Sequence, residues 1–163
     1  MSRLRVRASL LSIVLPSVAV LGCGDDGTDT RVPATVAVTP ETVTFSSIDD
    51  TQQLSVAALD EAGNTINTTV TWSSSDPSVA TVSGSGLATA LANGTTTITA
   101  TANTVPGSAE VTVQQVVASV TVLPGTLSLM ATLTDRITVT PEDGNGNRVA
   151  GASVVWASGN PGA

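Results

Sequence analysis

Apolar and polar residues alternate in short stretches along most of the chain, and turn residues separate these stretches. Such alternation is typical of half-buried strands. In residues 70–102 it predicts four strands, with Trp72 on the inward face of the first and Ile98 on the inward face of the last. Pro77 ends the first strand because proline has no backbone N–H. Asn93-Gly94, before the last strand, has the composition of a hairpin turn, since both residues tolerate positive φ.

The same alternation predicts strands on both sides of this stretch. They are expected around Val36 and Phe45, with a break at Pro40, around Val56, and over residues 110–114. About seven strands at a spacing of roughly 8–12 residues are typical of an immunoglobulin-like antiparallel β-sandwich. Only 2% of the residues are aromatic, so the core must consist mainly of aliphatic side chains. We therefore predict an all-β fold.

The pattern repeats after residue 115. Pro124 follows Pro40, and Trp156 follows Trp72, in each case by 84 residues. An Asp-x-x-Gly-Asn turn that begins at residue 60 returns at residue 143, which is 83 residues later. A fixed period with matching residues indicates tandem modules.

The two copies differ in length. The first is predicted to be a complete module over residues 34–115. The second, over residues 116–163, contains three matching strands, the last at Val154–Trp156, but no counterpart of residues 79–113. We expect it to be incomplete and part of a longer array, because so short a segment buries too little apolar surface to offset its ordering entropy.

Residues 1–22 have the pattern of an export signal. Arg3, Arg5 and Arg7 precede an apolar segment over residues 8–21. As a helix, this segment would span about 21 Å, which is short of the ~30 Å hydrocarbon core of a bilayer. The pattern therefore favours a cleaved signal peptide over a transmembrane anchor.

The segment ends in Val-Leu-Gly-Cys, which resembles the signal of bacterial lipoproteins, although Leu21 is larger than the residue usual at its position. The resemblance implies cleavage between Gly22 and Cys23, acylation of the Cys23 sulfur and attachment to membrane lipid. Cys23 is the only cysteine, so no intramolecular disulfide accounts for it. The alternative is a plain secretory signal with an incidental cysteine. After Cys23, the polar and acidic residues up to 33 predict a flexible tether.

Charge narrows the choice of partners. Without residues 1–22, three arginines remain against 13 acidic residues, which gives a formal charge of −10, and the chain has no lysine. Such a surface cannot neutralise phosphates, so nucleic acid is excluded as a partner.

The side chains that catalysis requires are scarce. The chain has no His, Lys or Tyr, which excludes Ser-His-Asp and Cys-His sites and histidine-based metal sites. Neighbouring carboxylates occur in turns, where exposure predicts ordinary pKa values. These pairs are Asp49/Asp50, Asp60/Glu61 and Glu142/Asp143. We predict no catalytic residue, no metal site and no cofactor, and therefore no enzyme activity.

Two features have a functional alternative to a structural role. Asp143-x-Asn145-x-Asn147 has the opening spacing of a calcium loop, but Arg148 stands where that loop needs glycine. We interpret this segment, like the turn at residue 60, as a turn that uses Gly and Asn for positive φ. Trp72 offers a surface for stacking on a sugar, but its inward position favours a role in the core.

The run Trp-Ser-Ser-Ser-Asp-Pro-Ser-Val-Ala-Thr-Val begins at residue 72, and Gly-x-Ala and Gly-x-x-x-Ile-Thr-Ala follow at residues 86 and 94. These segments resemble the bacterial immunoglobulin-like domain of group 2. The resemblance implies the sandwich fold. It implies no particular ligand, because such modules serve as adhesins, spacers and accessory domains.

Taken together, these features predict a bacterial lipoprotein of the cell envelope that is anchored through Cys23 and faces out of the cytoplasm. Its modules are expected to act as a non-enzymatic binding or adhesion module, or as a surface stalk. A cell-surface protein or a polysaccharide is the expected class of ligand, and no ligand-binding residue is identified. The alternative is a carbohydrate-contacting accessory region of a surface hydrolase whose catalytic domain lies outside this chain.

Overall fold

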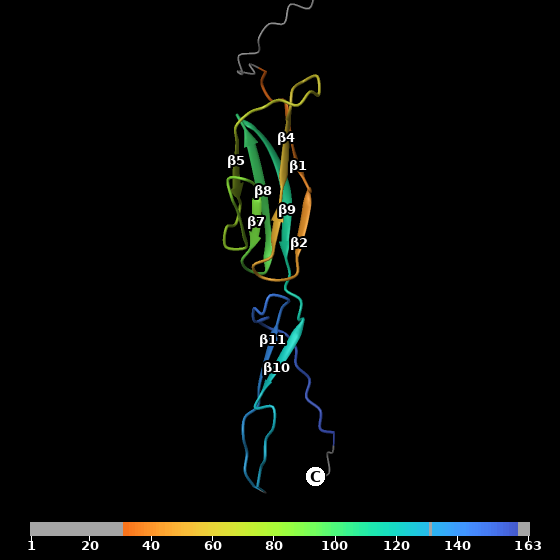
Figure 1. Cartoon of the computed structure of the whole chain (residues 1–163), viewed down its shortest axis with the longest axis vertical. Coiled ribbons are helices and arrows are strands. Elements are labelled where there is room, and N and C mark those ends of the chain that lie inside the picture. The colour runs from red at the N-terminus through yellow and green to blue at the C-terminus, as the bar shows by residue number, and fades with distance from the viewer. Residues whose placement is uncertain (1–30, 131, 160–163) are drawn as a thin grey trace, which may run out of the picture.

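A computed structural model describes residues 31–130 and 132–159. The predicted signal peptide, the Gly22–Cys23 cleavage site and most of the tether lie outside the described residues. The described part contains eleven strands and no helix, arranged along one long axis (Figure 1). The strands are β1 (Thr35–Thr39), β2 (Thr42–Phe45), β3 (Thr51–Gln53), β4 (Ser55–Leu59), β5 (Val70–Ser74), β6 (Ala80–Val82), β7 (Leu87–Ala90), β8 (Gly94–Ala102), β9 (Val105–Val113), β10 (Ser119–Leu123) and β11 (Thr138–Glu142).

Strands β1 to β9 build a β-sandwich. One layer is a four-stranded sheet in the order β2-β9-β8-β5. The other layer consists of the β1-β4 pair and the three-stranded sheet β3-β7-β6. Every pair is antiparallel except β2 with β9, which are parallel. The predicted all-β immunoglobulin-like fold is confirmed.

The core lies between the two layers and is almost entirely aliphatic. On β8, Ile98, Ala100 and Ala102 are fully buried, as the alternation predicted. Val111 and Val113 of β9 face the same interior. Phe45 is the one phenylalanine of the chain and is also buried there. The small alanines let the two sheets approach closely, which suits a core with few aromatic rings.

At two positions, Pro40 and Leu54, the strand pairing breaks and the chain moves from one sheet to another. The chain crosses from one layer to the other at Pro40, so that β1 pairs with β4 while β2 pairs with β9. Proline suits this crossing because it cannot donate to a strand ladder. Leu54 separates β3 from β4, and its N–H donates to the carbonyl of Gly86 over 2.8 Å. Its side chain is 1% exposed and enters the core.

The prediction of a hairpin at Asn93-Gly94 is wrong. β7 and β8 lie in different layers and are not paired, so this turn crosses the sandwich. Gly94 has a positive φ of 150°, whereas Asn93 does not have a positive φ. The hairpin forms instead between β8 and β9, where Asn103 has a φ of 55°. Turn composition identified a chain reversal correctly, but it did not specify whether the two strands share a sheet.

Strands β10 and β11 repeat the pairing of β1 with β4. Val36 lies opposite Ala58, and Val120 lies opposite Pro141, so the offsets are 84 residues for one strand and 83 for the other. The bridge between Leu59 and Thr65 returns between Glu142 and Arg148. The two strands form a separate ribbon below the sandwich (Figure 1).

The strand predicted at Val154–Trp156 is not formed. These residues lie in no strand, and Val155 and Trp156 are 93% and 59% exposed. In the sandwich, the corresponding strand β5 pairs along its length with β8. No strand described after β11 takes that place, so the backbone at residue 156 lacks a partner ladder.

Candidate functional site

The most elaborate polar site lies where the sandwich meets the β10–β11 ribbon. Two segments form it. The docking turn is residues 143–147, which follow β11, and the receiving loop is residues 46–50, which follow β2. Gln115, just after β9, completes the site, and we call the whole the junction.

Asp143 organises the docking turn from within. Its Oδ1 accepts hydrogen bonds from the backbone N–H groups of Asn145 and Asn147, at 3.1 and 2.9 Å. The N–H of Gly146 donates to the Asp143 carbonyl, and Gly146 has a φ of 83°. Asn145 and Asn147 do not have a positive φ. The segment is therefore a turn, as predicted, but only its glycine supplies the positive φ that was expected of both glycine and asparagine.

The second oxygen of Asp143 binds the sandwich. Oδ2 accepts from the N–H of Ile48 and from Nε2 of Gln115, each over 2.9 Å. Next to it, the N–H of Gly144 donates to Oγ of Ser47 over 3.2 Å. Asp143 is 2% exposed and Ser47 5% exposed, so these bonds are shielded from solvent. A carboxylate that is buried but accepts four hydrogen bonds is fully satisfied.

Two asparagine side chains of the docking turn extend the contact. Nδ2 of Asn145 donates to the carbonyl of Ile48 over 2.8 Å and to Oδ1 of Asp50 over 3.0 Å. Nδ2 of Asn147 donates to the same carbonyl over 3.2 Å and to Oδ2 of Asp49 over 3.3 Å. Of the three side chains with the spacing of a calcium loop, the Asp143 carboxylate thus shapes the turn and docks it, and the two asparagines dock through their amide nitrogens.

The electrostatics of Asp143 contradict the expectation from sequence. Burial by itself raises the pKa of its carboxyl, but the hydrogen bonds from Gln115, Ile48, Asn147 and Asn145 outweigh burial and lower that pKa to about 2. Asp143 was expected to be exposed with an ordinary pKa, and both expectations are wrong. The reason is partly tertiary, because two of the donors, Ile48 and Gln115, lie 95 and 28 residues away in the sequence.

Gln115 is a residue that sequence reasoning did not single out. Its backbone N–H donates to Oδ1 of Asn93 over 2.7 Å, and its Oε1 accepts from Nδ2 of Asn93 over 3.1 Å. This pair of bonds leaves Nε2 to reach Asp143 and the carbonyl of Arg148. Asn93 therefore serves the junction, although its sequence context indicated only a turn.

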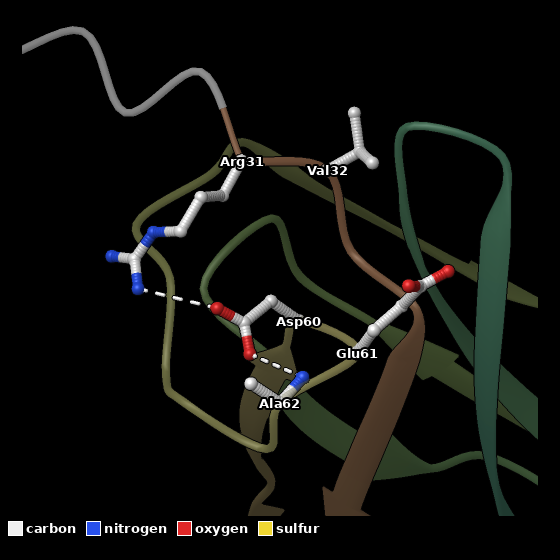
Figure 2. A pocket seen from close by; sticks show the side chains of 5 residues that line it. All are labelled: Arg31, Val32, Asp60, Glu61 and Ala62. Atoms are coloured by element: carbon white, nitrogen blue, oxygen red, sulfur yellow. Dashed lines mark hydrogen bonds and ion pairs between the residues drawn. The ribbon is translucent and has the colours of Figure 1, made fainter.

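The matching turn at residues 60–64 follows β4 and lies at the end of the sandwich away from β10 and β11 (Figure 1), next to the start of the described chain (Figure 2). Oδ1 of Asp60 accepts from the N–H groups of Ala62 and Asn64, as in the docking turn. Oδ2 lies 3.3 Å from Nη1 of Arg31. The bonds from Asn64 and Ala62 and the Arg31 charge lower the pKa of Asp60 against a smaller effect of burial, so its expected ordinary pKa is also wrong.

An open hollow of about 280 Å³ lies beside this turn and is lined by Arg31, Val32, Asp60, Glu61 and Ala62. Figure 2 shows Arg31 reaching across it to Asp60, while Glu61 points away. The hollow holds no histidine, cysteine or hydroxyl that would supply a nucleophile. Two of its charged side chains, Arg31 and Asp60, form an ion pair.

Trp72 packs against the core without being fully enclosed. It is half-buried at the rim of the sandwich. A Cβ placed on Gly86 would lie 2.9 Å from Cζ2 of the indole and 2.7 Å from the carbonyl oxygen of Leu54. The ring thus lies directly over Gly86, where only a glycine fits. The core interpretation of Trp72 agrees with this packing, although the predicted inward position is a rim position.

Thr96 explains the serine-rich run that follows Trp72. This threonine is 3% exposed, and its Oγ1 accepts from the N–H of Asp76 over 2.9 Å. The same oxygen bonds the hydroxyls of Ser74 and Ser75 at 3.1 and 3.0 Å. One buried hydroxyl on β8 therefore holds the bend at the end of β5.

The outward face of the four-stranded sheet is rich in hydroxyl groups. The register places Thr71 beside Thr101, Thr95 beside Thr112, and Thr44 beside Thr112 on the other side. Glu110 is the charged residue on this face of the described strands. The face is therefore polar and weakly charged.

Among residues 31–130 and 132–159, no three His, Cys, Asp or Glu side chains are grouped so that they could bind a metal ion. No helix of this part of the chain is long and apolar enough to cross a membrane.

Comparison with known proteins identifies the sandwich. Residues 33–113 match the bacterial Ig-like domain family (group 2). This part of the chain belongs to that family. The strands of the group 2 Ig-like domain are β1 to β9, and its match ends just before Gln115 and the junction.

Individual relatives are also similar. Ice-binding protein 1 of Shewanella frigidimarina (strain NCIMB 400) is 34% identical over 128 residues, which covers 76% of this chain. The chain spans 14% of the length of that relative. Among solved structures, domains 5–6 of the S-layer protein SbsC are 28% identical with a TM-score of 0.47, over 72% of this chain and 65% of that one. Domains 4 and 5 of SbsC are 28% identical with a TM-score of 0.47, over 51% and 53%.

Proposed function

We propose that this protein is a non-enzymatic lipoprotein, held on the outer side of a bacterial membrane by an acylated Cys23, whose Ig-like modules form a surface stalk with a binding or adhesion role. Residues 116–163 then belong to a second module, of which β10 and β11 are the first strands. The acidic tether before the sandwich separates it from the membrane.

The observation that carries the stalk proposal is the junction. Asp143, Gly144, Asn145 and Asn147 all donate to or accept from the receiving loop. Several hydrogen bonds in parallel restrict rotation between two bodies far more than the chain connection alone. A stalk needs this property, because a flexible joint would let the outer module fold back toward the membrane.

Support for a non-enzymatic role comes from the inventory of side chains. The described carboxylates with lowered pKa values are Asp60, Asp76 and Asp143. All three accept hydrogen bonds from residues of their own turns, and Asp143 also accepts from Ile48 and Gln115. A general acid or base needs a pKa near the working pH, and these shifts run in the opposite direction.

The stalk is tested on the mature protein by measuring how freely the ribbon moves relative to the sandwich. Residual dipolar couplings of the backbone N–H groups should fit one common alignment tensor for β1 to β9 and for β10 and β11. Two tensors of clearly different magnitude would show independent motion and would contradict a stiff stalk.

The lipid anchor is tested separately by Cys23→Ser in a bacterial host. We expect the variant to leave the membrane fraction or to keep residues 1–22, because two or three acyl chains bind a membrane durably. Ala8→Ser, within the same leader, serves as the control and should be processed normally. Unchanged location and unchanged mature mass of Cys23→Ser would exclude the anchor.

Contact with a polysaccharide is a second candidate function. The observation that favours it is the hydroxyl-rich outer face formed by β2, β9, β8 and β5. Threonine hydroxyls both donate to and accept from sugar hydroxyls. If this face binds polysaccharide, titration of the protein with a panel of polysaccharides should shift the amide NMR signals of Thr97 and Thr99. If no polysaccharide shifts them, this second function is wrong and the stalk is the remaining role.

A further inference from the structure

The two Asp-x-x-Gly-Asn turns have the same internal geometry but different surroundings. In both, the aspartate N–H donates to the carbonyl of the final asparagine, and the glycine N–H donates to the aspartate carbonyl. The glycines have φ values of 81° and 83°. Within residues 31–130 and 132–159, the turn at 143–147 docks on the receiving loop, whereas the turn at 60–64 meets Arg31.

The turns differ at the two residues after the aspartate. The docking turn has Gly144 and Asn145, whereas the other turn has Glu61 and Ala62. From these positions we infer that Gly144 and Asn145 make this turn specific for docking on the end of an Ig-like module. At the equivalent turn, Glu61 and Ala62 prevent such docking. The inference rests on the proposed stalk function, because it names the residues that select the contact between consecutive modules of the stalk.

Gly144 matters because the receiving loop comes very close. A Cβ at this position would lie 3.1 Å from Oγ of Ser47, which is tighter than an ordinary van der Waals contact. Ser47 is buried and its Oγ already accepts from the Gly144 N–H, so it has little freedom to withdraw. A glutamate here would also add a carboxylate to a junction that already contains Asp49, Asp50 and Asp143, and like charges repel.

Asn145 matters because its amide supplies two of the bonds across the junction. Nδ2 reaches the carbonyl of Ile48 at 2.8 Å and Oδ1 of Asp50 at 3.0 Å. Alanine, as at position 62, supplies neither bond. The aspartate and the final asparagine are common to both turns, so they account for the shape of the turn and not for the choice of partner.

The occupant that fits a docking turn is therefore the end of a module of this kind. It needs a backbone N–H and a carbonyl at the position of Ile48, a small hydroxyl residue before it, and an amide donor such as Gln115. The turn at 60–64 cannot receive such an end, because Glu61 would meet the hydroxyl residue and Arg31 already pairs with Oδ2 of Asp60. The stacking contact thus has a fixed direction along the chain.

The test exchanges the residues of one turn for those of the other in the mature protein. The double variant Gly144→Glu/Asn145→Ala gives the docking turn the sequence of the other turn. Amide hydrogen exchange at Ile48 should accelerate about tenfold or more, because three bonds across the junction are lost. The N–H of Asn147, which bonds Asp143 within the turn, and that of Ala118, which pairs with Glu142, should keep their protection and show that the ribbon is intact.

The matched control is Glu61→Gly/Ala62→Asn at the other turn. It should leave exchange at Ile48 unchanged, because that turn does not touch the receiving loop. Asn145→Ala alone separates the loss of the amide from the clash and should give an intermediate acceleration. Unchanged protection of Ile48 in the Gly144→Glu/Asn145→Ala variant overturns the inference. The dipolar couplings of the unmodified protein, by contrast, test the stalk itself, so failure of one proposal is distinguishable from failure of the other.

Discussion

Nε2 of Gln115 donates to Oδ2 of Asp143 over 2.9 Å, and the two residues stand on opposite sides of the junction. Gln115 is itself fixed by two hydrogen bonds to Asn93, which lies in the turn between β7 and β8. The Asp143 carboxylate is therefore connected, through the Gln115 side chain, to the turn that joins the two layers of the sandwich. Because it is negatively charged, the bond is stronger than one between neutral groups.

This arrangement predicts how the junction depends on pH. The pKa of Asp143 is lowered from 3.8 to about 2 in the docked state, so the charged form is the one that docks. The stabilisation is fully present above about pH 4 and is lost as the pH falls through about 2. Asp49, Asp50, Glu142 and Arg148 are the other charged groups near the turn.

The measurement is an acid titration of the mature protein followed by amide NMR. The Ile48 N–H signal should move toward the position of an unbonded amide below about pH 3, before the signals of β8 report unfolding of the sandwich. In Asp143→Asn the Ile48 signal should already be displaced at neutral pH and should not titrate in this window. If both proteins titrate identically, another carboxyl controls the junction.

A second prediction concerns the contact between Trp72 and Gly86. Gly86→Ala should destabilise the sandwich for two reasons. A non-glycine residue at a φ of 83° costs about 1–2 kcal/mol, and a methyl group 2.9 Å from the indole and 2.7 Å from the Leu54 carbonyl adds about 1–3 kcal/mol of overpacking. The free energy of unfolding in urea should therefore fall by about 2–5 kcal/mol.

Two other glycines separate these terms. Gly63 has a φ of 81° and nothing within 4 Å of its Cβ position, so Gly63→Ala should show the backbone cost alone. Gly84 has neither a positive φ nor a close neighbour, so Gly84→Ala should change stability by less than about 0.5 kcal/mol. Equal losses at Gly86 and Gly63 would mean that the indole moves aside freely, and the packing role of Trp72 would then be wrong.

Much of the sandwich could be predicted from the period of its side chains. Alternation places Ile98 and Val111 in the core because strand geometry alone fixes which face a residue occupies. The Asn93-Gly94 turn was misassigned because composition specifies a reversal but not the sheet that receives the next strand. The junction was missed because the environment of Asp143 depends on donors at Ile48 and Gln115, which no local pattern brings together.

The role of Thr96 likewise could not be predicted from local sequence, and a prediction about its hydroxyl group follows from the structure. Parity places it inward, yet a threonine in a core of alanine and valine has no evident purpose until its Oγ1 is seen to bond the Asp76 N–H and the hydroxyls of Ser74 and Ser75. Thr96→Val keeps the shape and removes this oxygen. It leaves a backbone donor without a partner, which costs about 1–3 kcal/mol.

Thr96→Ser keeps the oxygen and loses only a methyl group, so it should restore part of the stability that Thr96→Val loses. Thr97→Val changes the neighbouring, exposed position and should stay within about 0.5 kcal/mol of the unmodified protein. Urea unfolding of the three variants, with hydrogen exchange at Asp76, measures both effects. A valine variant as stable as the serine variant, with Asp76 still protected, would show that the bend after β5 is held by Pro77 and the serines themselves and does not need the buried hydroxyl.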